Sequence, residues 1–198
     1  MKKKEYIEKQ ANRYSLVVIG VSWGGVSALR NIFSHLSTDF SLPIIIVQHI
    51  SKDFNVNEKS YWEKYCKIPA KEAEDKEKIK DGHIYFAPPN YHVIVERDMR
   101  LSLDASEPVN YARPSVDVLF ESAALALSNK IVAIILTGAN NDGADGLKAI
   151  KESGGLTIVQ NPNSAECSDM TGAALDATDV DHVLELDEIG PFLMALNN

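Results

Sequence analysis

Short apolar runs alternate along this chain with longer segments in which apolar residues recur at helical spacing. Hardly any polar residue interrupts the runs at residues 16–20, 44–47 and 131–136. A strand covered by helices on both faces of a parallel sheet has this continuous apolar pattern. Apolar positions recur every three or four residues in segments 26–36, 116–128 and 144–152, which predicts helices. The alternation predicts an α/β domain, a doubly wound, mostly parallel sheet in three layers.

The remaining segments extend the same pattern. A strand is predicted at residues 155–160, a short helix at 170–176, a strand or turn at 181–186 and a closing helix at 188–196. A further helix is predicted at residues 55–66. We expect Trp62 and Tyr65 of that helix to pack on the sheet.

Residues 68–103 have a different texture. Short alternating pieces are broken by turn sequences such as Asp81-Gly82 and Pro88-Pro89-Asn90. Turns at this frequency predict hairpins rather than βα units, so we expect an antiparallel hairpin annex on one edge of the sheet. His83 and His92 lie in this annex, but a metal site would need further ligands, and we expect none.

The turn after the first strand carries a candidate nucleophile. Residues 20–24 fit the pattern G-x-S-x-G, in which small residues around Ser22 let a sharp turn expose the hydroxyl. A nucleotide-binding loop is disfavoured, because the dinucleotide fingerprint needs glycine at position 22 and no Gly-Lys-Ser/Thr follows. A serine in a glycine-rich turn can also be a helix cap, so the motif alone leaves both interpretations open.

Two further polar residues follow apolar strands. His49 ends the run at 44–47, and Asp142 lies in a glycine-rich turn after the run at 131–136. Ligand sites of open parallel sheets lie at the carboxyl ends of strands, so these side chains are expected near Ser22. Ser22 would attack a carbonyl, His49 would take its proton, and Asp142 would orient the imidazole. Backbone N–H groups near Trp23 would hold the oxyanion.

Composition narrows the class of protein. The 198 residues suit one domain at 15–198 after a charged tail at 1–14, and the net charge of −8 argues against a nucleic-acid-binding face. No apolar run approaches the ~20 residues of a membrane span, and the first residues lack the core of a signal peptide. Cys66 and Cys167 form neither a disulfide framework nor a metal motif. We expect a cytoplasmic protein without membrane insertion.

Six motifs occur in order along the chain: Ile19-Gly20-Val21-Ser22-Trp23-Gly24-Gly25, Val47-Gln48-His49, Ala87-Pro88, Arg113-Pro114-Ser115-Val116-Asp117, Leu136-Thr137-Gly138-Ala139-Asn140-Asn141-Asp142-Gly143 and Gln160-Asn161-Pro162. Together they resemble the catalytic domain of the bacterial chemotaxis protein-glutamate methylesterases, the CheB family, over residues 16–192. The resemblance places the family's catalytic residues on Ser22, His49 and Asp142. It implies hydrolysis of glutamate methyl esters on cytoplasmic chemoreceptor helices, releasing methanol. It also implies deamidation of some receptor glutamines, without a metal or cofactor.

The chain departs from the family pattern around the expected triad. Trp23 stands where a small hydroxylated residue usually follows the nucleophile, Ala112 replaces a histidine, and Thr171 replaces the proline of a Gly-Met-Pro stretch. These changes bear on substrate identity more than on reaction type. A rival interpretation is a non-catalytic interaction module, a decayed esterase whose Trp23 fills the pocket. Arg113 is expected either to orient a substrate or to pair on the surface.

The expected control of the site also follows from the resemblance. In the family this domain usually follows a receiver domain that covers the active-site face until it is phosphorylated. Only about fifteen residues precede the first strand here, whereas an ordinary domain needs on the order of 100. We expect a site that is constitutively accessible or gated by a separate regulatory protein.

Overall fold

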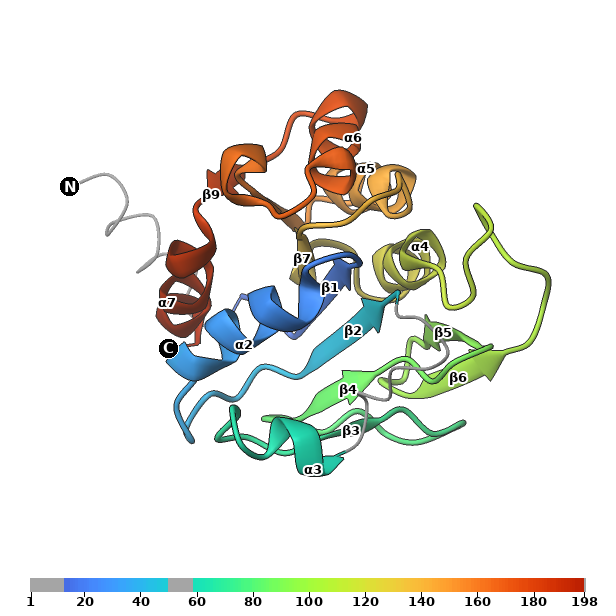
Figure 1. The fold of residues 1–198 in the computed structure, drawn as a ribbon. Coiled ribbons are helices and arrows are strands. Elements are labelled where there is room, and N and C mark those ends of the chain that lie inside the picture. The colour runs from blue at the N-terminus through green and yellow to red at the C-terminus, as the bar shows by residue number, and fades with distance from the viewer. Residues whose placement is uncertain (1–12, 50–58, 198) are drawn as a thin grey trace.

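The computed structural model of the protein describes residues 13–49 and 59–197. Its main sheet has seven parallel strands in the order β3-β4-β2-β1-β7-β8-β9, and two more strands form a separate antiparallel pair (Figure 1). The strands of the main sheet are β1 (Leu16–Val21), β2 (Ile44–Gln48), β3 (Ala70–Glu72), β4 (Ile84–Phe86), β7 (Ile131–Ile135), β8 (Leu156–Gln160) and β9 (His182–Leu184). The antiparallel pair is β5 (His92–Val95) and β6 (Leu101–Asp104).

Helices cover both faces of the main sheet (Figure 1). One face packs against α2 (Gly25–His35) and α7 (Leu186–Leu196), and the short α3 (Lys59–Trp62) lies beside β3. The other face packs against α4 (Val116–Leu127), α5 (Ala144–Glu152) and α6 (Asp169–Ala177). The predicted three-layer, mostly parallel α/β fold with a small antiparallel part is therefore confirmed.

The burial of β1 on both faces explains why its sequence contains no polar residue. Val17, Ile19 and Val21 belong to the core under α2 and α7. Leu16 and Val18 belong to the separate core under α4 and α5. Successive side chains of a strand point to opposite faces, so a strand covered on both sides must be apolar at every position.

The expectation of hairpins for the first half of residues 68–103 was wrong. Strands β3 and β4 pair in parallel with each other, and β4 pairs in parallel with β2. The turn-rich connection between β3 and β4 crosses over and pairs with the chain at the start of β6. Its hydrogen bonds run from Lys76 N to Leu101 O and from Ile79 N to Met99 O, both 2.8 Å. The turn residues thus mark a crossover, and only β5 and β6 form the expected hairpin.

The predicted helix at residues 55–66 ends earlier than expected. Within the described part, α3 ends at Trp62, and the N–H groups of Tyr65 and Cys66 both donate to Trp62 O at 2.9 Å, closing the last turn. Trp62 is buried against Phe33 and Phe86, as expected for a residue packing on the sheet. Residues 55–58 lie outside the described residues.

Strand β1 lies between β2 and β7, and the strand order runs away from it in both directions. In doubly wound sheets a crevice opens where the order reverses, at the carboxyl ends of the strands. Gly20 lets α4 approach this point, because a Cβ at residue 20 would lie 2.3 Å from Val116 Cγ1. The residues that follow β1, β2 and β7 therefore share one edge of the sheet.

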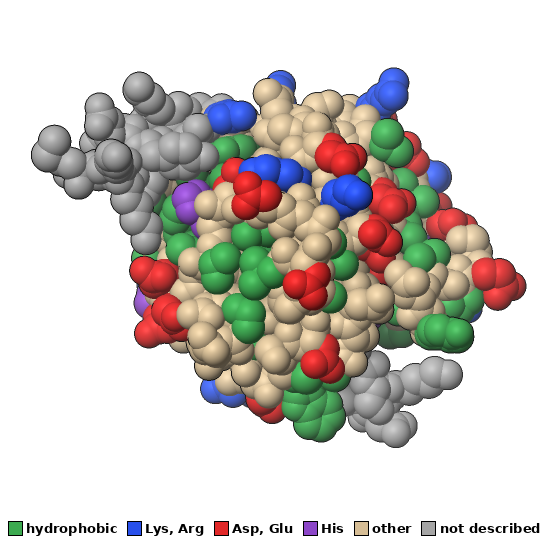
Figure 2. All heavy atoms as spheres, turned by 90° about the horizontal axis from the view of Figure 1, so that it is seen from above, with side chains coloured by type: hydrophobic (Ala, Val, Ile, Leu, Met, Phe, Trp, Pro, Cys, Tyr) green, Lys and Arg blue, Asp and Glu red, His purple; other side chains and the backbone are tan. Residues whose placement is uncertain are grey.

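The surface is mixed in charge. Acidic side chains are spread over the face seen in Figure 2, with basic and apolar ones between them, in keeping with the net charge of −8. None of the helices within residues 13–49 and 59–197 combines the length and apolarity needed to cross a membrane.

Candidate functional site

Ser22 lies in the tight turn between β1 and α2. Its N–H donates to Thr137 O at 3.0 Å, so the turn is tied to the loop that follows β7. Gly24 ends the turn with φ of 78°, a left-handed conformation that favours glycine. A Cβ at Gly24 would also lie 2.8 Å from the Glu166 side chain. The turn therefore requires the second glycine of the predicted G-x-S-x-G pattern.

The start of α2 supplies free hydrogen-bond donors beside Ser22. Among the described residues, the N–H groups of Trp23 and Gly24 have no hydrogen-bond acceptor, whereas the Gly25 N–H donates to Ser22 O at 2.9 Å. Unpaired N–H groups at a helix N-terminus, with the positive end of the helix dipole, suit a developing oxyanion. Trp23 itself is 65% exposed.

His49 follows β2 and lies beside the Ser22 turn. Its N–H donates to Val21 O at 2.9 Å, which extends the pairing of β2 with β1. Its ring atom Nε2 lies 2.9 Å from Oδ2 of Asp142, although the N–H is not aligned as in a well-formed hydrogen bond. His49 and Asp142 are thus brought into contact, as the sequence predicted.

Asp142 is 1% exposed and is held by the N-terminus of α4. Its carboxylate accepts hydrogen bonds from Ser115 Oγ at 2.8 Å, Val116 N at 2.7 Å and Asp117 N at 3.1 Å. Burial by itself raises the pKa of Asp142, but His49 and these backbone donors outweigh burial, and the pKa lies below its usual value. Asp142 is therefore a carboxylate that stays ionised.

The third predicted residue, Ser22, lies on the same edge of the sheet. Among the described residues, no hydrogen bond joins the Ser22 hydroxyl to His49. The loop carrying Asp142 nevertheless passes next to Ser22, since a Cβ at Gly138 would lie 2.8 Å from Ser22 Cβ. Hydrogen bonds between catalytic residues are often long in free enzymes and tighten when substrate binds.

Two residues at the site escaped the sequence prediction. Asn140 Nδ2 lies 3.0 Å from His49 Nδ1, and Ser115 Oγ donates to Asp142. Ser115 is also the N-cap residue of α4, where its Oγ accepts from Val118 N. The sequence offered one indication for Asn140, its position two residues before Asp142 in the same turn.

Asp117 is a second buried carboxyl group next to Asp142. Oδ1 of Asp117 accepts from Gly143 N at 2.9 Å and Gly146 N at 2.8 Å, and Oδ2 accepts from Asn110 Nδ2 at 2.9 Å. Burial, together with the nearby charge of Asp142, raises the pKa of Asp117 to about 6 despite these donors. Asp117 thus joins α4 to the start of α5.

Replacing Asp117 with asparagine is expected to change how stability depends on pH. The folded state keeps the Asp117 proton between pH 3.8 and about 6, where the unfolded chain has lost it. As pH rises through this window, Asp117 lowers the free energy of unfolding by up to about 3 kcal/mol. Denaturant unfolding at pH 4, 5, 6 and 7 should show this loss in wild type and not in Asp117→Asn.

Glu121, an exposed acidic residue on α4, supplies the control, because Glu121→Gln removes an acidic charge from the same helix and that charge is not among the causes of the raised pKa of Asp117. Equal pH slopes in wild type and Asp117→Asn would contradict the assignment. Asp142 affects stability at lower pH and with the opposite sign. Because its pKa is lower in the folded state, the free energy of unfolding falls as the pH drops below the ordinary pKa of an aspartate.

The other candidate residues have structural partners. His92 is buried, with Nδ1 accepting from Ser115 N at 3.2 Å and Nε2 lying 3.2 Å from Glu107 O, so both ring nitrogens are engaged. His83 Nδ1 lies 2.8 Å from Asp81 O. Arg113 Nη1 donates to Ala105 O and Ser106 O, so the guanidinium holds its own loop rather than pointing freely at a substrate. Residues 13–49 and 59–197 contain no group of three metal-ligating side chains.

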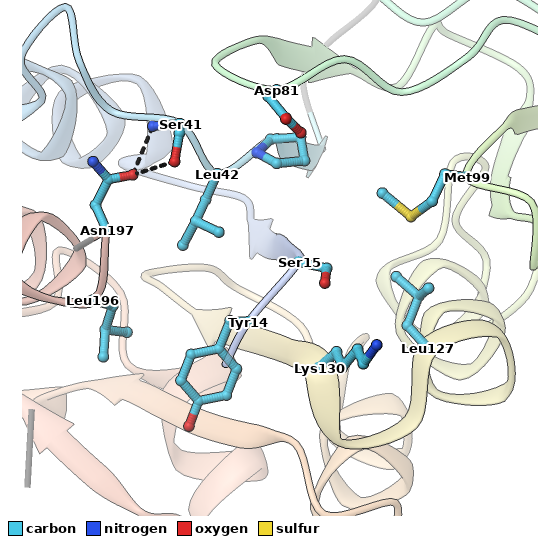
Figure 3. Close-up of a pocket in the computed structure, with 11 residues that line it drawn as sticks. Tyr14, Ser15, Ser41, Leu42, Asp81, Met99, Leu127, Lys130, Leu196 and Asn197 are labelled. Carbon is cyan, nitrogen blue, oxygen red and sulfur yellow. Dashed lines mark hydrogen bonds between the residues drawn. The ribbon is translucent and has the colours of Figure 1, made fainter. Parts of the chain in front are cut away.

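A hollow of about 440 Å³ lies at the opposite end of the sheet (Figure 3). Its lining includes Ser15, Pro43 and Lys130, which immediately precede β1, β2 and β7. Ser22, His49 and Asp142 follow these same strands. The hollow is therefore separated from the candidate site by the length of the strands.

Comparisons with known proteins agree with this arrangement. The family model of the CheB methylesterases matches residues 17–193. A relative from Leptospira interrogans, provisionally named protein-glutamate methylesterase/protein-glutamine glutaminase, is 49% identical over 184 residues, which is 93% of this chain and 95% of the relative. The enzyme of that name from Salmonella typhimurium is 37% identical over 91% of this chain, and this chain spans 52% of its length.

A solved structure gives the same result. The CheB methylesterase catalytic domain of Thermotoga maritima superposes with a TM-score of 0.85 at 32% identity, over 92% of this chain and 98% of that domain. Matching sequence and fold along almost the whole chain leave one conclusion. The chain belongs to the CheB methylesterase family.

Proposed function

We propose that this protein hydrolyses methyl esters of protein glutamate residues, with Ser22 as nucleophile, His49 as general base and Asp142 as the carboxylate that orients His49. The contact between His49 and Asp142, 2.9 Å apart at the sheet edge that also carries Ser22, is the observation that supports the mechanism best. The relatives' names supply the reaction, and the methylated cytoplasmic helices of chemoreceptors are the proposed substrate.

In the first half-reaction Ser22 Oγ attacks the ester carbonyl carbon while its proton passes to the His49 imidazole. The carbonyl π electrons move onto oxygen, and the N–H groups of Trp23 and Gly24 stabilise the oxyanion. Asp142 stabilises the imidazolium. When the carbonyl re-forms, methoxide leaves, takes the proton from His49 and departs as methanol.

In the second half-reaction water replaces Ser22 as the nucleophile. His49 takes a proton from water as its oxygen attacks the acyl carbon, and collapse of the intermediate expels Ser22 Oγ, which recovers that proton. The product is the glutamate carboxylate. A glutamine side chain would follow the same path and release ammonia instead of methanol, in line with the glutaminase half of the relatives' names.

The direct test is incubation of the purified chain with a methylated receptor cytoplasmic fragment. We expect methanol release together with loss of methyl groups from the glutamates, detected by mass spectrometry of receptor peptides. A receptor fragment with glutamine at the same positions should release ammonia if the chain is also a glutaminase. Absence of both products on fully methylated receptor would contradict the proposal and favour a binding module.

Replacing Trp23 with threonine is expected to change substrate preference rather than create activity. A ring that is 65% exposed lies at the rim of the site, where it limits which surfaces approach Ser22. We expect KM for folded receptor to change at least about threefold while kcat on a small methyl ester changes less, because the Trp23 N–H is retained.

Leu125 provides the matched control for Trp23, since it is a large exposed apolar residue near the far end of α4. Leu125→Thr should leave both kinetic constants unchanged. A wild-type protein that is inert on all methyl esters but becomes active as Trp23→Thr would support a blocked pocket and overturn the rim interpretation.

A further inference from the structure

The amide of Asn140 has a fixed orientation in the site. Its Oδ1 accepts a hydrogen bond from the backbone N–H of Asp142 at 3.1 Å, forming a short turn within the loop. Because the oxygen is committed to this N–H donor, the other end of the amide, the Nδ2 group, is the one that lies 3.0 Å from His49 Nδ1. A flipped amide would place two donors against each other at Asp142 N.

This orientation determines which nitrogen of His49 carries a proton. An amide NH₂ group can only donate, so Nδ1 must offer its lone pair. The ring proton of neutral His49 therefore resides on Nε2, the nitrogen that lies 2.9 Å from Asp142 Oδ2. Both neighbours of the ring favour the same tautomer, one as a donor and the other as an acceptor.

We infer that Asn140 is a positioning residue that holds His49 in the Nε2–H tautomer and so keeps Nδ1 free of a proton. The inference rests on the proposed function, because Nδ1 is then the atom that receives the proton of Ser22. As that proton moves from Ser22 Oγ to Nδ1, the Asn140 N–H must withdraw, since two N–H groups cannot share one hydrogen bond. Asn140 thus keeps the lone pair of His49 Nδ1 available until the proton of Ser22 is transferred to it.

The sharpest test is Asn140→Asp. The replacement keeps the shape of the side chain and the oxygen that accepts from Asp142 N, but it puts an acceptor in place of the donor facing His49. A proton on Nδ1 becomes favourable between the new carboxylate and the ring, and the base loses its lone pair. We expect kcat for ester hydrolysis to fall by about 10²-fold or more at neutral pH, with KM within about twofold.

The matched control is Asn141→Asp, which adds the same charge one residue away at an exposed position. It should keep kcat within about threefold. Nitrogen-15 NMR of the His49 ring measures which ring nitrogen is protonated, and this would not change if Asn140 only stabilised the loop. In wild type we expect an unprotonated Nδ1 and a protonated Nε2, and in Asn140→Asp a protonated Nδ1.

Several results would overturn the inference. One is a wild-type spectrum with the neutral-ring proton on Nδ1, whatever the kinetics. Another is Asn140→Asp with unchanged kcat, or Asn141→Asp with the same loss as Asn140→Asp. If Asn140→Asp does not fold, Asn140→Ala replaces it. Asp142 still favours a proton on Nε2 in that variant, so loss of the amide should raise the share of rings protonated on Nδ1 above that of wild type without abolishing the Nε2–H form. A share equal to that of wild type would contradict the role of Asn140.

Failure of the proposed function is distinguishable from failure of this inference. If wild type hydrolysed no ester, or Ser22→Ala kept full activity, the proposed function would fail. The ring tautomer, read by NMR in the absence of substrate, would still decide whether Asn140 sets the protonation of His49.

Discussion

Ser22→Ala is expected to lower methyl ester hydrolysis by about three to six orders of magnitude, since no other group in the turn can form the acyl intermediate. The fold should be unaffected, because the Ser22 contacts that shape the turn are made by its backbone N–H and carbonyl. Methanol release from methylated receptor under single-turnover conditions measures the loss. Unchanged thermal unfolding would show that chemistry, and not structure, was removed.

Ser27 is the natural control, an exposed serine on α2. Ser27→Ala should retain wild-type rates. His49→Ala should lose about as much activity as Ser22→Ala, and the double variant should be little worse than either, since a triad acts as a unit. A double variant that is far slower than both single variants, or a Ser22→Ala protein with wild-type turnover, would rule out this assignment.

Asp142→Ala should damage both activity and stability. The substitution leaves Ser115 Oγ and the N–H groups of Val116 and Asp117 buried without an acceptor. Each unpaired buried donor costs about 1–3 kcal/mol, so the loss of acceptors for three donors should lower the free energy of unfolding by at least about 3 kcal/mol. Hydrolysis should fall by at least about 10³-fold, because His49 loses the group that orients it. Denaturant unfolding and receptor demethylation measure the two effects.

Asp145→Ala separates these effects from simple loss of an acidic residue in the same region. Asp145 is exposed in the first turn of α5, so its loss should cost under about 1 kcal/mol and leave hydrolysis unchanged. An Asp142→Ala protein as stable as wild type would show that the carboxylate does not hold the start of α4. Retention of turnover would show that it does not orient His49.

The sequence was sufficient for the main sheet and for the meeting of His49 with Asp142. The runs that became β1, β2 and β7 contain only apolar residues because helices cover both faces, and this pattern is visible without a structure. Once three such strands are parallel, their carboxyl ends must share an edge. The placement of polar residues after each strand therefore indicated where to look for a candidate site.

The features that the sequence did not reveal depend on contacts between distant segments. Turn residues in the β3–β4 connection signal reversals, but the parallel direction of β4 depends on its pairing with β2. From the local sequence Asn140 is an ordinary turn residue. Its contact with the ring of His49 exists only because the end of β2 lies beside the loop after β7. Likewise Ser115 could be identified as a helix cap from local sequence, whereas its bond to Asp142 could not.

The distribution of the proposed site over strands β1, β2 and β7 also has a consequence for folding. Ser22 comes from the first fifth of the chain and Asp142 from the last third, so the site consists of contacts with a large sequence separation. Such contacts are costly in loop-closure entropy and tend to slow folding. Esterase activity should therefore return during refolding only when β1, β2 and β7 have paired. Turnover would then report assembly of the central sheet rather than formation of single helices.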